Sequence, residues 1–314
     1  MLVQRRIIFF TIIILFTVFT ALTGVIIYAS DFDHDVIEES EEEAVLYEDE
    51  IPEEEQGPDL TDERFSFEDD DLLPEDEELL LDDEEESIPV NRGVLVFVID
   101  DAGNSLWELE QFLNFPGSLT IAVLPGLPNS IESARLVREA GMELILHQPM
   151  ESLGGTNPGP GAILNGMERE EIREIVNRNL DELWPVAGMN NHEGSRITMN
   201  EEIMEIILEI CREREIYFLD SRTTADSVVS AVAGRMEIPF AERHVFIDNF
   251  QSAESMETYI NAGLLRAEQR GYSVMIGHAW SIALAPLLKD LYPELIENGF
   301  IFSTVSELLM ERDQ

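Results

Sequence analysis

Short apolar runs alternate with helical patterns in the chain after residue 92. Runs dominated by apolar residues occupy 94–100, 119–124, 143–147, 216–220, 244–248 and 273–277, with weaker examples at 185–190 and 299–302. Amphipathic stretches of helical period lie between them, notably at 169–183, 200–214 and 255–270. Buried strands that alternate with helices are typical of a parallel sheet covered by helices. The pattern predicts an α/β fold, an irregular (β/α) barrel of seven or eight parallel strands.

The first thirty residues follow a different pattern. Residues 7–29 carry no charge, and a helix of that length is about 34 Å long, enough to cross a hydrocarbon core of about 30 Å. Arg5 and Arg6 precede this run and an acidic stretch follows it. The positive-inside rule then predicts a single-pass signal-anchor in the cell membrane, with everything after residue 30 on the extracytoplasmic side. A signal peptide cleaved near Ala29 is the alternative, and it exports the same domain.

A strongly acidic segment separates the apolar run from the barrel pattern. Residues 31–90 contain 30 Asp and Glu and one basic residue, Arg64, in a chain of net charge −46. Such a composition cannot bury enough apolar surface to fold, so we expect a disordered acidic linker. The predicted organisation is therefore a cytoplasmic stub with a transmembrane helix over 1–30, the linker over 31–91, and a catalytic domain over 92–314.

Charge and cysteine content limit the partners of the domain. Residues 91–314 carry 35 acidic and 16 basic residues, a net charge of −19, which argues against nucleic acid as a partner. The single cysteine, Cys211, cannot form an internal disulfide, and its helical apolar context predicts a buried side chain. The sequence contains no signal for an oligomeric state.

Polar side chains gather where the predicted strands end. They are Asp100, Asp101, His147, Asn190, Asn191, His192, Asp220, Asp248 and His278. In a (β/α) barrel these ends converge on the face that carries the active site. An Asp after an apolar strand is also a common helix N-cap, an alternative that holds for Asp220 and Asp248. Taken together, histidines and carboxylates at converging ends favour a catalytic divalent metal site.

Other catalytic signatures are missing from the sequence. It contains no G-x-S-x-G nucleophile elbow, no H-E-x-x-H motif and no G-x-x-x-x-G-K-S/T phosphate loop. The glycine-rich run 157–164 has no following Lys or Thr, so a loop that lines the site explains it better than a phosphate cradle.

The segments VFVIDDAGNS, TIAVLPGLP, LILHQPMES, PGPGAIL, NNHEGSRIT, FLDSRTTADSV, FIDN and IGHAW occur in this order over residues 93–309. In this order and spacing they resemble the divergent polysaccharide deacetylase family, a branch of the carbohydrate esterases that deacetylate chitin-like or peptidoglycan sugars. Two departures stand out. The H-x-x-x-H segment of the wider superfamily is missing after His147, and so is its Arg-x-Pro motif.

The resemblance implies roles for individual residues. Asp100 is expected to be the general base, and the metal ligands are expected to be Asp101, His147 and His192. His278 resembles the acid histidine, and Asp220 resembles the carboxylate that orients it. Arg222 or Arg196 is the candidate replacement for the missing arginine.

The expected substrate contacts are Asn191, Arg196 and Trp280, although a packing role for Trp280 is an equal alternative. Zinc is the favoured ion for two histidines and one carboxylate, with cobalt, nickel or manganese as alternatives. The resulting hypothesis is a metal-dependent hydrolase that removes N-acetyl groups from an envelope or extracellular polysaccharide. The competing hypothesis is a non-catalytic envelope protein that uses the same pocket to bind a glycan or to regulate a partner.

Overall fold

The computed structural model describes residues 91–312. The predicted transmembrane helix and nearly all of the predicted acidic linker lie outside this range. Within it, no helix combines the length and the apolar character needed to cross a membrane.

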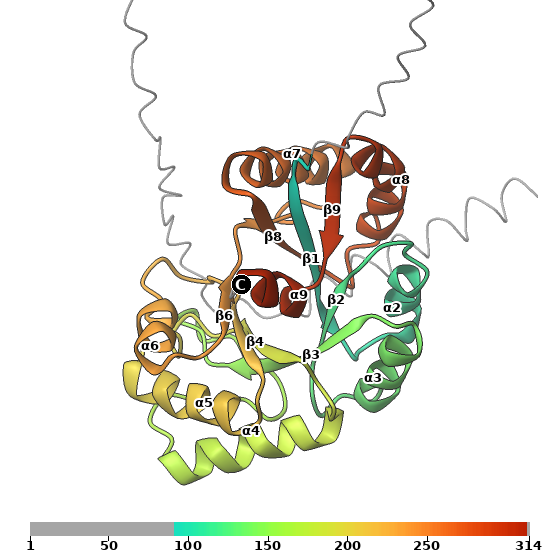
Figure 1. The fold of residues 1–314 in the computed structure, drawn as a ribbon. Helices are drawn as coiled ribbons and strands as arrows, with labels where there is room; N and C mark the ends of the chain where they lie inside the picture. Colours follow the sequence, from blue (N-terminus) through green and yellow to red (C-terminus); the bar gives the residue numbers. More distant parts are fainter. Residues whose placement is uncertain (1–90, 313–314) are drawn as a thin grey trace, which may run out of the picture. The chain divides into compact units, whose positions relative to one another are not determined.

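Strands and helices alternate along almost the whole domain (Figure 1). The strands are β1 (Gly93–Ala102), β2 (Thr120–Val123), β3 (Glu143–Met150), β4 (Gly188–Glu193), β5 (Tyr217–Asp220), β6 (Phe240–Glu242), β7 (Val245–Phe246), β8 (Tyr272–His278) and β9 (Phe300–Ser303). The helices are α2 (Leu106–Leu113), α3 (Ser130–Glu139), α4 (Arg169–Leu183), α5 (Glu201–Glu213), α6 (Val229–Met236), α7 (Ala253–Arg270), α8 (Leu284–Glu297) and α9 (Val305–Arg312).

The nine strands form one parallel sheet that curls on itself. Its order is β6-β5-β4-β3-β2-β1-β8-β7, and β9 pairs with the first half of β1. The two ends of this path, β6 and β7, are separated in sequence only by Arg243 and His244. β6 pairs with β5, and β7 pairs with β8. One bent stretch of chain therefore joins the two ends of the sheet, and the result is an irregular (β/α) barrel.

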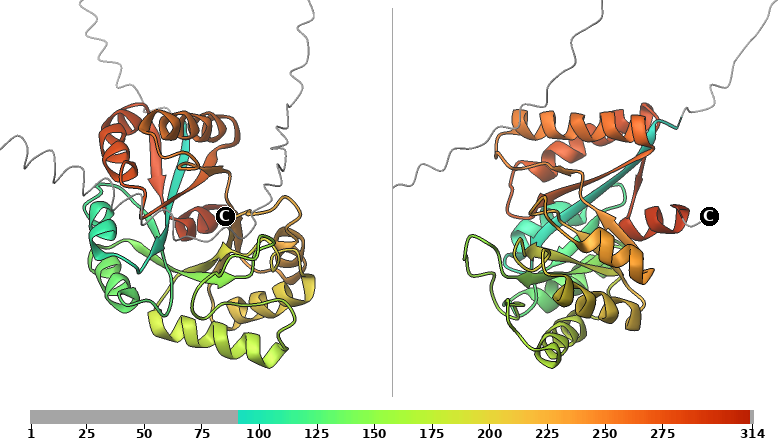
Figure 2. Two further views of the ribbon diagram at one scale, coloured as in Figure 1. Left: turned by 180° about the vertical axis from the view of Figure 1, so that it is seen from behind. Right: turned by 90° about the vertical axis from the view of Figure 1, so that its left-hand side faces the viewer.

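Two apolar layers hold the barrel together, because the central strands are buried on both faces. One side of the strands packs inward, where Val96, Val98, Ile145, Leu219 and Ile276 belong to the same buried cluster. The other side packs against the surrounding helices in a larger cluster. Figures 1 and 2 show α2 to α8 arranged around the outside of the sheet. Burial on both faces explains why the strands are continuous apolar runs.

Helix α9 lies across the opening of the curled sheet (Figure 1) and contacts β1 and β6. Its Val305 and Leu308 are part of the inner cluster. Its N-terminus is held by Glu143 at the start of β3, whose carboxylate accepts hydrogen bonds from the backbone N–H groups of Val305 and Ser306 at 3.1 and 3.2 Å. A carboxylate at a helix N-terminus is favoured by the helix dipole. This end of the barrel is therefore closed by protein.

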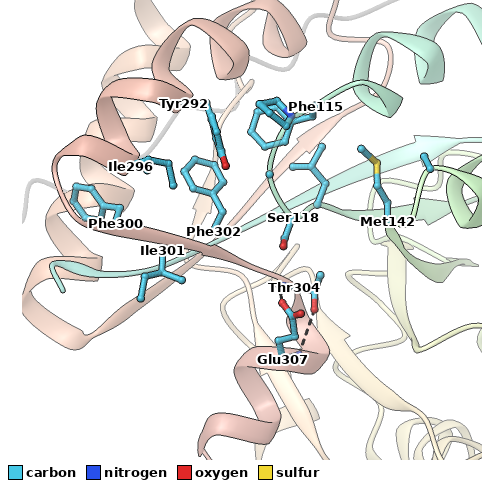
Figure 3. Close-up of a pocket in the computed structure, with 15 residues that line it drawn as sticks. Phe115, Ser118, Met142, Tyr292, Ile296, Phe300, Ile301, Phe302, Thr304 and Glu307 are labelled. Carbon is cyan, nitrogen blue, oxygen red and sulfur yellow. Dashed lines mark hydrogen bonds between the residues drawn. The ribbon is translucent and has the colours of Figure 1, made fainter. Parts of the chain in front are cut away.

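A cavity of about 560 Å³ lies at this same end of the barrel. Figure 3 shows its wall, which includes Phe115, Met142, Tyr292 and Phe302 from the segments that precede β2 and β3 and from α8 and β9. The polar residues expected in the active site lie at the opposite, carboxyl ends of the strands and do not line it.

The predicted fold is confirmed in its main features, with three corrections. The sheet has nine strands, because β6 is only three residues long and had no recognisable apolar run. The run 244–248 contributes only two residues, β7. The weak run 185–190 is shifted, and the strand extends through Asn190 to Glu193.

Candidate active site

The end of β1 is bent so that two adjacent carboxylates can enter one site. Relative to β2, β1 has one extra residue between Ile99 and Ala102, which is a bulge. Asp101 lies within it and has a positive φ of 62°, a conformation that costs a non-glycine residue of order 1–3 kcal/mol. Side chains of neighbouring strand residues normally point to opposite faces. The bulge removes that restriction for Asp100 and Asp101.

Three predicted metal ligands converge beside this bulge. Asp101 Oδ1 lies 2.9 Å from His192 Nδ1 and 3.2 Å from His147 Nε2. The two imidazole nitrogens are themselves 3.2 Å apart. In a tetrahedral zinc site with bonds of about 2.0–2.2 Å, ligand atoms lie roughly 3.3 Å from one another. The spacing of these three atoms, from β1, β3 and β4, matches that arrangement.

Asn190 fixes the orientation of the His147 ring. Its Oδ1 lies 2.7 Å from His147 Nδ1, and its Nδ2 donates to Asp100 Oδ1 at 2.8 Å. A carboxylate needs a donor, so the amide N–H faces Asp100 and the amide oxygen faces His147. Nδ1 of His147 then carries a proton, so that Nε2, which faces Asp101, is the nitrogen available to an ion. This is the tautomer that a metal-ligating histidine requires.

The electrostatics of the cluster favour a cation. Asp101 Oδ1 is buried, and within residues 91–312 it accepts no hydrogen bond of acceptable geometry. Burial raises the pKa of Asp101, but its contacts with His147 and His192 outweigh burial and hold the pKa well below its usual range. Burial lowers the pKa of His147, but Asp100 and Asp101 outweigh it and raise the pKa to about 9. The donor set and the orphaned oxygen both fit a divalent ion.

Asp100 is the carboxylate next to this cluster, and it is 2% exposed. Burial raises its pKa, although the nearby His147 and His278 oppose that effect. One of its oxygens accepts from Asn190, while Oδ2 lies 3.7 Å from His147 Nε2. Asp100 is thus placed beside the candidate ligands, and within residues 91–312 one of its oxygens has no hydrogen-bond partner, as a general base requires.

His278 ends β8 and is held by Asp248. Its Nδ1 lies 2.9 Å from Asp248 Oδ1, and its backbone N–H donates to Asp248 Oδ2 at 2.8 Å. Burial lowers the pKa of His278, but Asp248 outweighs burial and raises it. The ring lies between Phe246 and Trp280, with stacked geometries of 17° and 21°. His278 is therefore oriented and biased toward its protonated form.

Asp220 was expected to orient His278, and the structure corrects this assignment. The Asp220 carboxylate accepts from the backbone N–H of Arg222 at 2.8 Å and from the Ser227 hydroxyl at 2.6 Å. It holds the loop after β5. Asp248 contacts His278 instead and is not a helix cap, because Ser252 caps α7.

The expected substrate contacts are only partly available. Asn191 is 1% exposed, and its amide is used within the protein by the backbone of Ser221 and Glu193. It cannot contact a substrate in this arrangement. Arg196 pairs with Glu151 at 2.9 Å, and Arg222 lies 3.5 Å from Glu242. Neither arginine makes a direct contact with the candidate ligands.

Two important residues received no individual role in the sequence analysis. One is Asn190, whose only signal is its place beside His192 in the NNH segment. The other is Arg243 in the bend between β6 and β7, which donates to the backbone oxygens of Ser221 and Arg222 at 2.6 and 2.8 Å. Burial lowers the pKa of Arg243 to about 10, while Asp220 and Asp100 oppose that change. Arg243 therefore supports the loop after β5 and contributes positive charge near Asp100.

This geometry is accompanied by a family match. The family model described as divergent polysaccharide deacetylase matches residues 97–309, which span nearly the whole barrel and every residue of the cluster. The chain belongs to the divergent polysaccharide deacetylase family. The resemblance inferred from the motifs is thus confirmed.

Similar proteins occur in several bacteria. YibQ of Escherichia coli K12, an uncharacterized protein, is 29% identical over 206 residues, which cover 66% of this chain and 65% of YibQ. An uncharacterized protein of Haemophilus influenzae is 27% identical over 197 residues, or 63% of this chain and 70% of that one. The crystal structure of an uncharacterized protein from Agrobacterium tumefaciens C58 has a TM-score of 0.64 at 20% identity and covers 69% of this chain and 89% of its own. This last similarity shows the shared fold.

In this member of the family, the missing H-x-x-x-H segment has a structural explanation. β3 and β4 are neighbours, and Pro149 of β3 pairs in register with His192 of β4. A histidine at the end of β4 therefore reaches the ion site that His147 approaches from β3. The second histidine of the cluster comes from a different strand.

Proposed function

We propose that this divergent polysaccharide deacetylase is a metal-dependent hydrolase that removes N-acetyl groups from an envelope or extracellular polysaccharide. The observation that supports the proposal is the convergence of Asp101, His147 and His192 beside a buried Asp100 and an Asp-oriented His278. Family membership agrees with that chemistry.

Hydrolysis of an N-acetyl amide needs an attacking water, stabilisation of the carbonyl oxygen and a proton for the departing amine. Asp100 accepts the proton of the attacking water, because it lies beside the candidate ion site and burial raises its pKa. His278 donates a proton to the leaving nitrogen, because Asp248 raises its pKa and fixes its ring. The two groups thus act as base and acid.

Asp101, His147 and His192 would hold the ion. A divalent ion held there supplies Lewis-acid polarisation of the acetyl carbonyl and acidifies water. Two nitrogen donors and one carboxylate oxygen favour zinc, which commonly takes three protein ligands in catalytic sites. Asn190 keeps the His147 lone pair directed toward this position.

Acetate release tests the proposal directly. Full-length protein, loaded with zinc, is incubated with N-acetylated glycan oligomers, and free acetate is measured for the wild type and Asp101→Ala. We expect turnover in the wild type and a loss of at least about 100-fold in the variant. Asn104→Ala, an exposed residue close to β1, is the matched control and should keep its activity.

The same assay also tests the competing hypothesis of a non-catalytic binding protein. A zinc-loaded wild type that binds the glycan in calorimetry but releases no acetate would establish a binding protein instead of an enzyme. An Asp101→Ala variant with wild-type turnover would contradict the proposed role of the metal cluster.

We further propose that the enzyme acts outside the cytoplasm, tied to the cell membrane by residues 7–29. The sequence supports this through the uncharged run, the preceding arginines and the acidic segment that follows. Sixty linker residues in a random-coil regime span on the order of 40 Å, and like charges extend them further. This reach suits a substrate in the cell envelope.

A further inference from the structure

Trp280 makes a direct contact with one of the candidate ligands. It follows β8 by two residues, and its indole Nε1–H donates a hydrogen bond to Asp101 Oδ2 at 2.8 Å. The bond joins residues 179 positions apart in the sequence. Trp280 is 37% exposed, so its ring lies at the rim of the site while its N–H points inward.

Because of this hydrogen bond, the two oxygens of the Asp101 carboxylate have different partners. Oδ2 is bonded to Trp280, and Oδ1 faces His147 and His192 at 3.2 and 2.9 Å. The terminal torsion of an aspartate is broad and has little preference of its own. The indole N–H therefore sets which oxygen faces the histidines and holds it there.

The same indole also packs on the candidate acid. The rings of Trp280 and His278 stack with centroids 4.8 Å apart and an interplanar angle of 21°. Phe246 stacks on His278 at 5.8 Å, and Arg243 lies over the Phe246 ring at 3.8 Å. Arg243, Phe246, His278 and Trp280 thus form a row of stacked side chains. At its end, the indole N–H of Trp280 donates to Asp101.

We propose that Trp280 is a positioning residue that orients Asp101 toward the metal through its indole N–H while it supports the His278 ring. The inference rests on the proposed metal-dependent function and deepens it. Of the two roles expected from the sequence, a sugar contact and packing, the stack against His278 favours packing. Only the exposed part of the Trp280 ring is left to contact a sugar.

Zinc binding tests this role without reference to turnover. Full-length wild type, Trp280→Phe and Trp107→Phe are stripped with a chelator, and the Kd for zinc is measured by calorimetry. Trp280→Phe keeps an aromatic ring but removes the donor, so its Kd should rise about 10–100-fold, the usual effect of removing a hydrogen bond to a metal ligand. Trp107, which is 56% exposed on α2, is the matched control and should keep the wild-type Kd.

Indole fluorescence supplies a second readout, which reports whether zinc binds beside Trp280. The chain contains three tryptophans, and only Trp280 donates to a candidate ligand within residues 91–312. Zinc should shift the emission of the wild type and of Trp107→Phe, and this shift should be lost in Trp280→Phe. Thermal unfolding of the zinc-free proteins checks that all three are folded.

The outcomes separate the inference from the proposed function. If the wild type binds zinc and Trp280→Phe binds it with the same Kd and the same emission shift, Trp280 does not position Asp101, and the proposed function stands. If the wild type binds no zinc at all, the proposed function itself is contradicted, and the role of Trp280 is overturned with it.

Discussion

The side-chain amide of Asn190 links the candidate base, Asp100, to the candidate ligand His147. It accepts from His147 Nδ1 and donates to Asp100, and its side chain is fully buried. No other residue in the described barrel contacts both the candidate base and a candidate ligand by side-chain hydrogen bonds in this way. The residue should therefore influence metal affinity and turnover together.

Replacement of Asn190 by alanine tests that link. Asn190→Ala leaves the His147 tautomer unspecified and Asp100 without its donor, so we expect the Kd for zinc to rise about 10–100-fold. Acetate release at saturating zinc should also fall, because Asp100 is no longer oriented. Asn104→Ala serves as the control. Wild-type zinc affinity in Asn190→Ala would contradict the assigned tautomer.

Substitutions of the two buried aspartates, Asp248 and Asp220, should have different effects. Asp248→Asn removes the charge that raises the pKa of His278, so acetate release should fall by about 10²-fold or more, with zinc content unchanged. Asp220→Asn weakens the loop contacts to Ser227 and Arg222, so its main effect should be a lower free energy of unfolding. Acetate assays measure the loss of activity in both variants, and urea titrations measure the loss of stability. If Asp220→Asn lost activity and Asp248→Asn lost only stability, Asp220 would be the carboxylate that orients His278, as expected from the sequence.

At the scale of elements, the bend between β6 and β7 is the feature that sequence patterns could not predict. β6 and β7 together have five strand residues, too few for a recognisable period. Their pairing depends on distant contacts, including His244, whose Nδ1 accepts from the backbone N–H of Val274 at 2.8 Å. The longer strands and helices were predictable because burial on both faces or on one stripe imposes a repeating pattern over many residues.

The pKa of His244, which lies in this bend, predicts how the free energy of unfolding depends on pH. Burial, together with the positive charges of Arg266, Arg243 and Arg312, lowers its pKa from an ordinary 6.5 to about 4. The unfolded chain therefore takes up a proton between these values while the folded one does not, so this group's stabilising contribution is lost as the pH falls from about 6.5 to 4. After a discount for solvent screening at this partly exposed site, the loss is on the order of 2 kcal/mol.

His244→Asn removes the titrating group but keeps a side-chain acceptor. The difference in free energy of unfolding between wild type and variant, measured by urea titration from pH 4 to pH 7, cancels the many carboxylates that titrate in both. We expect that difference to change with pH in favour of the wild type at neutral pH. A difference that stays constant would show that His244 does not titrate in this way.

At the scale of the whole molecule, the sequence predicted the barrel and the convergence of its strand ends, but not the partners within the site. Asp101, His147 and His192 could be expected together because each follows or ends an apolar strand. The exchange of Asp220 for Asp248 could not be foreseen, since both end similar strands. Only the closure of the sheet through β6 and β7 decides which one reaches His278.

The predicted acidic linker gives a test at this scale. Deletion of residues 35–85 should leave acetate release from soluble glycan oligomers unchanged, because the catalytic cluster lies within residues 100–278. Release from intact envelopes should fall if the segment provides reach. Equal activity on both substrates in the deletion variant would show that reach has no role.

Zinc content is the measurement that tests the central claim most directly. Full-length wild type and His192→Ala are loaded with zinc, dialysed extensively, and analysed for metal per chain. We expect about one tightly held equivalent in the wild type and its loss in His192→Ala, because His192 supplies one of the three converging ligand atoms. A wild type that retains no zinc, or a variant that retains as much as the wild type, would contradict a metal centre built from β1, β3 and β4.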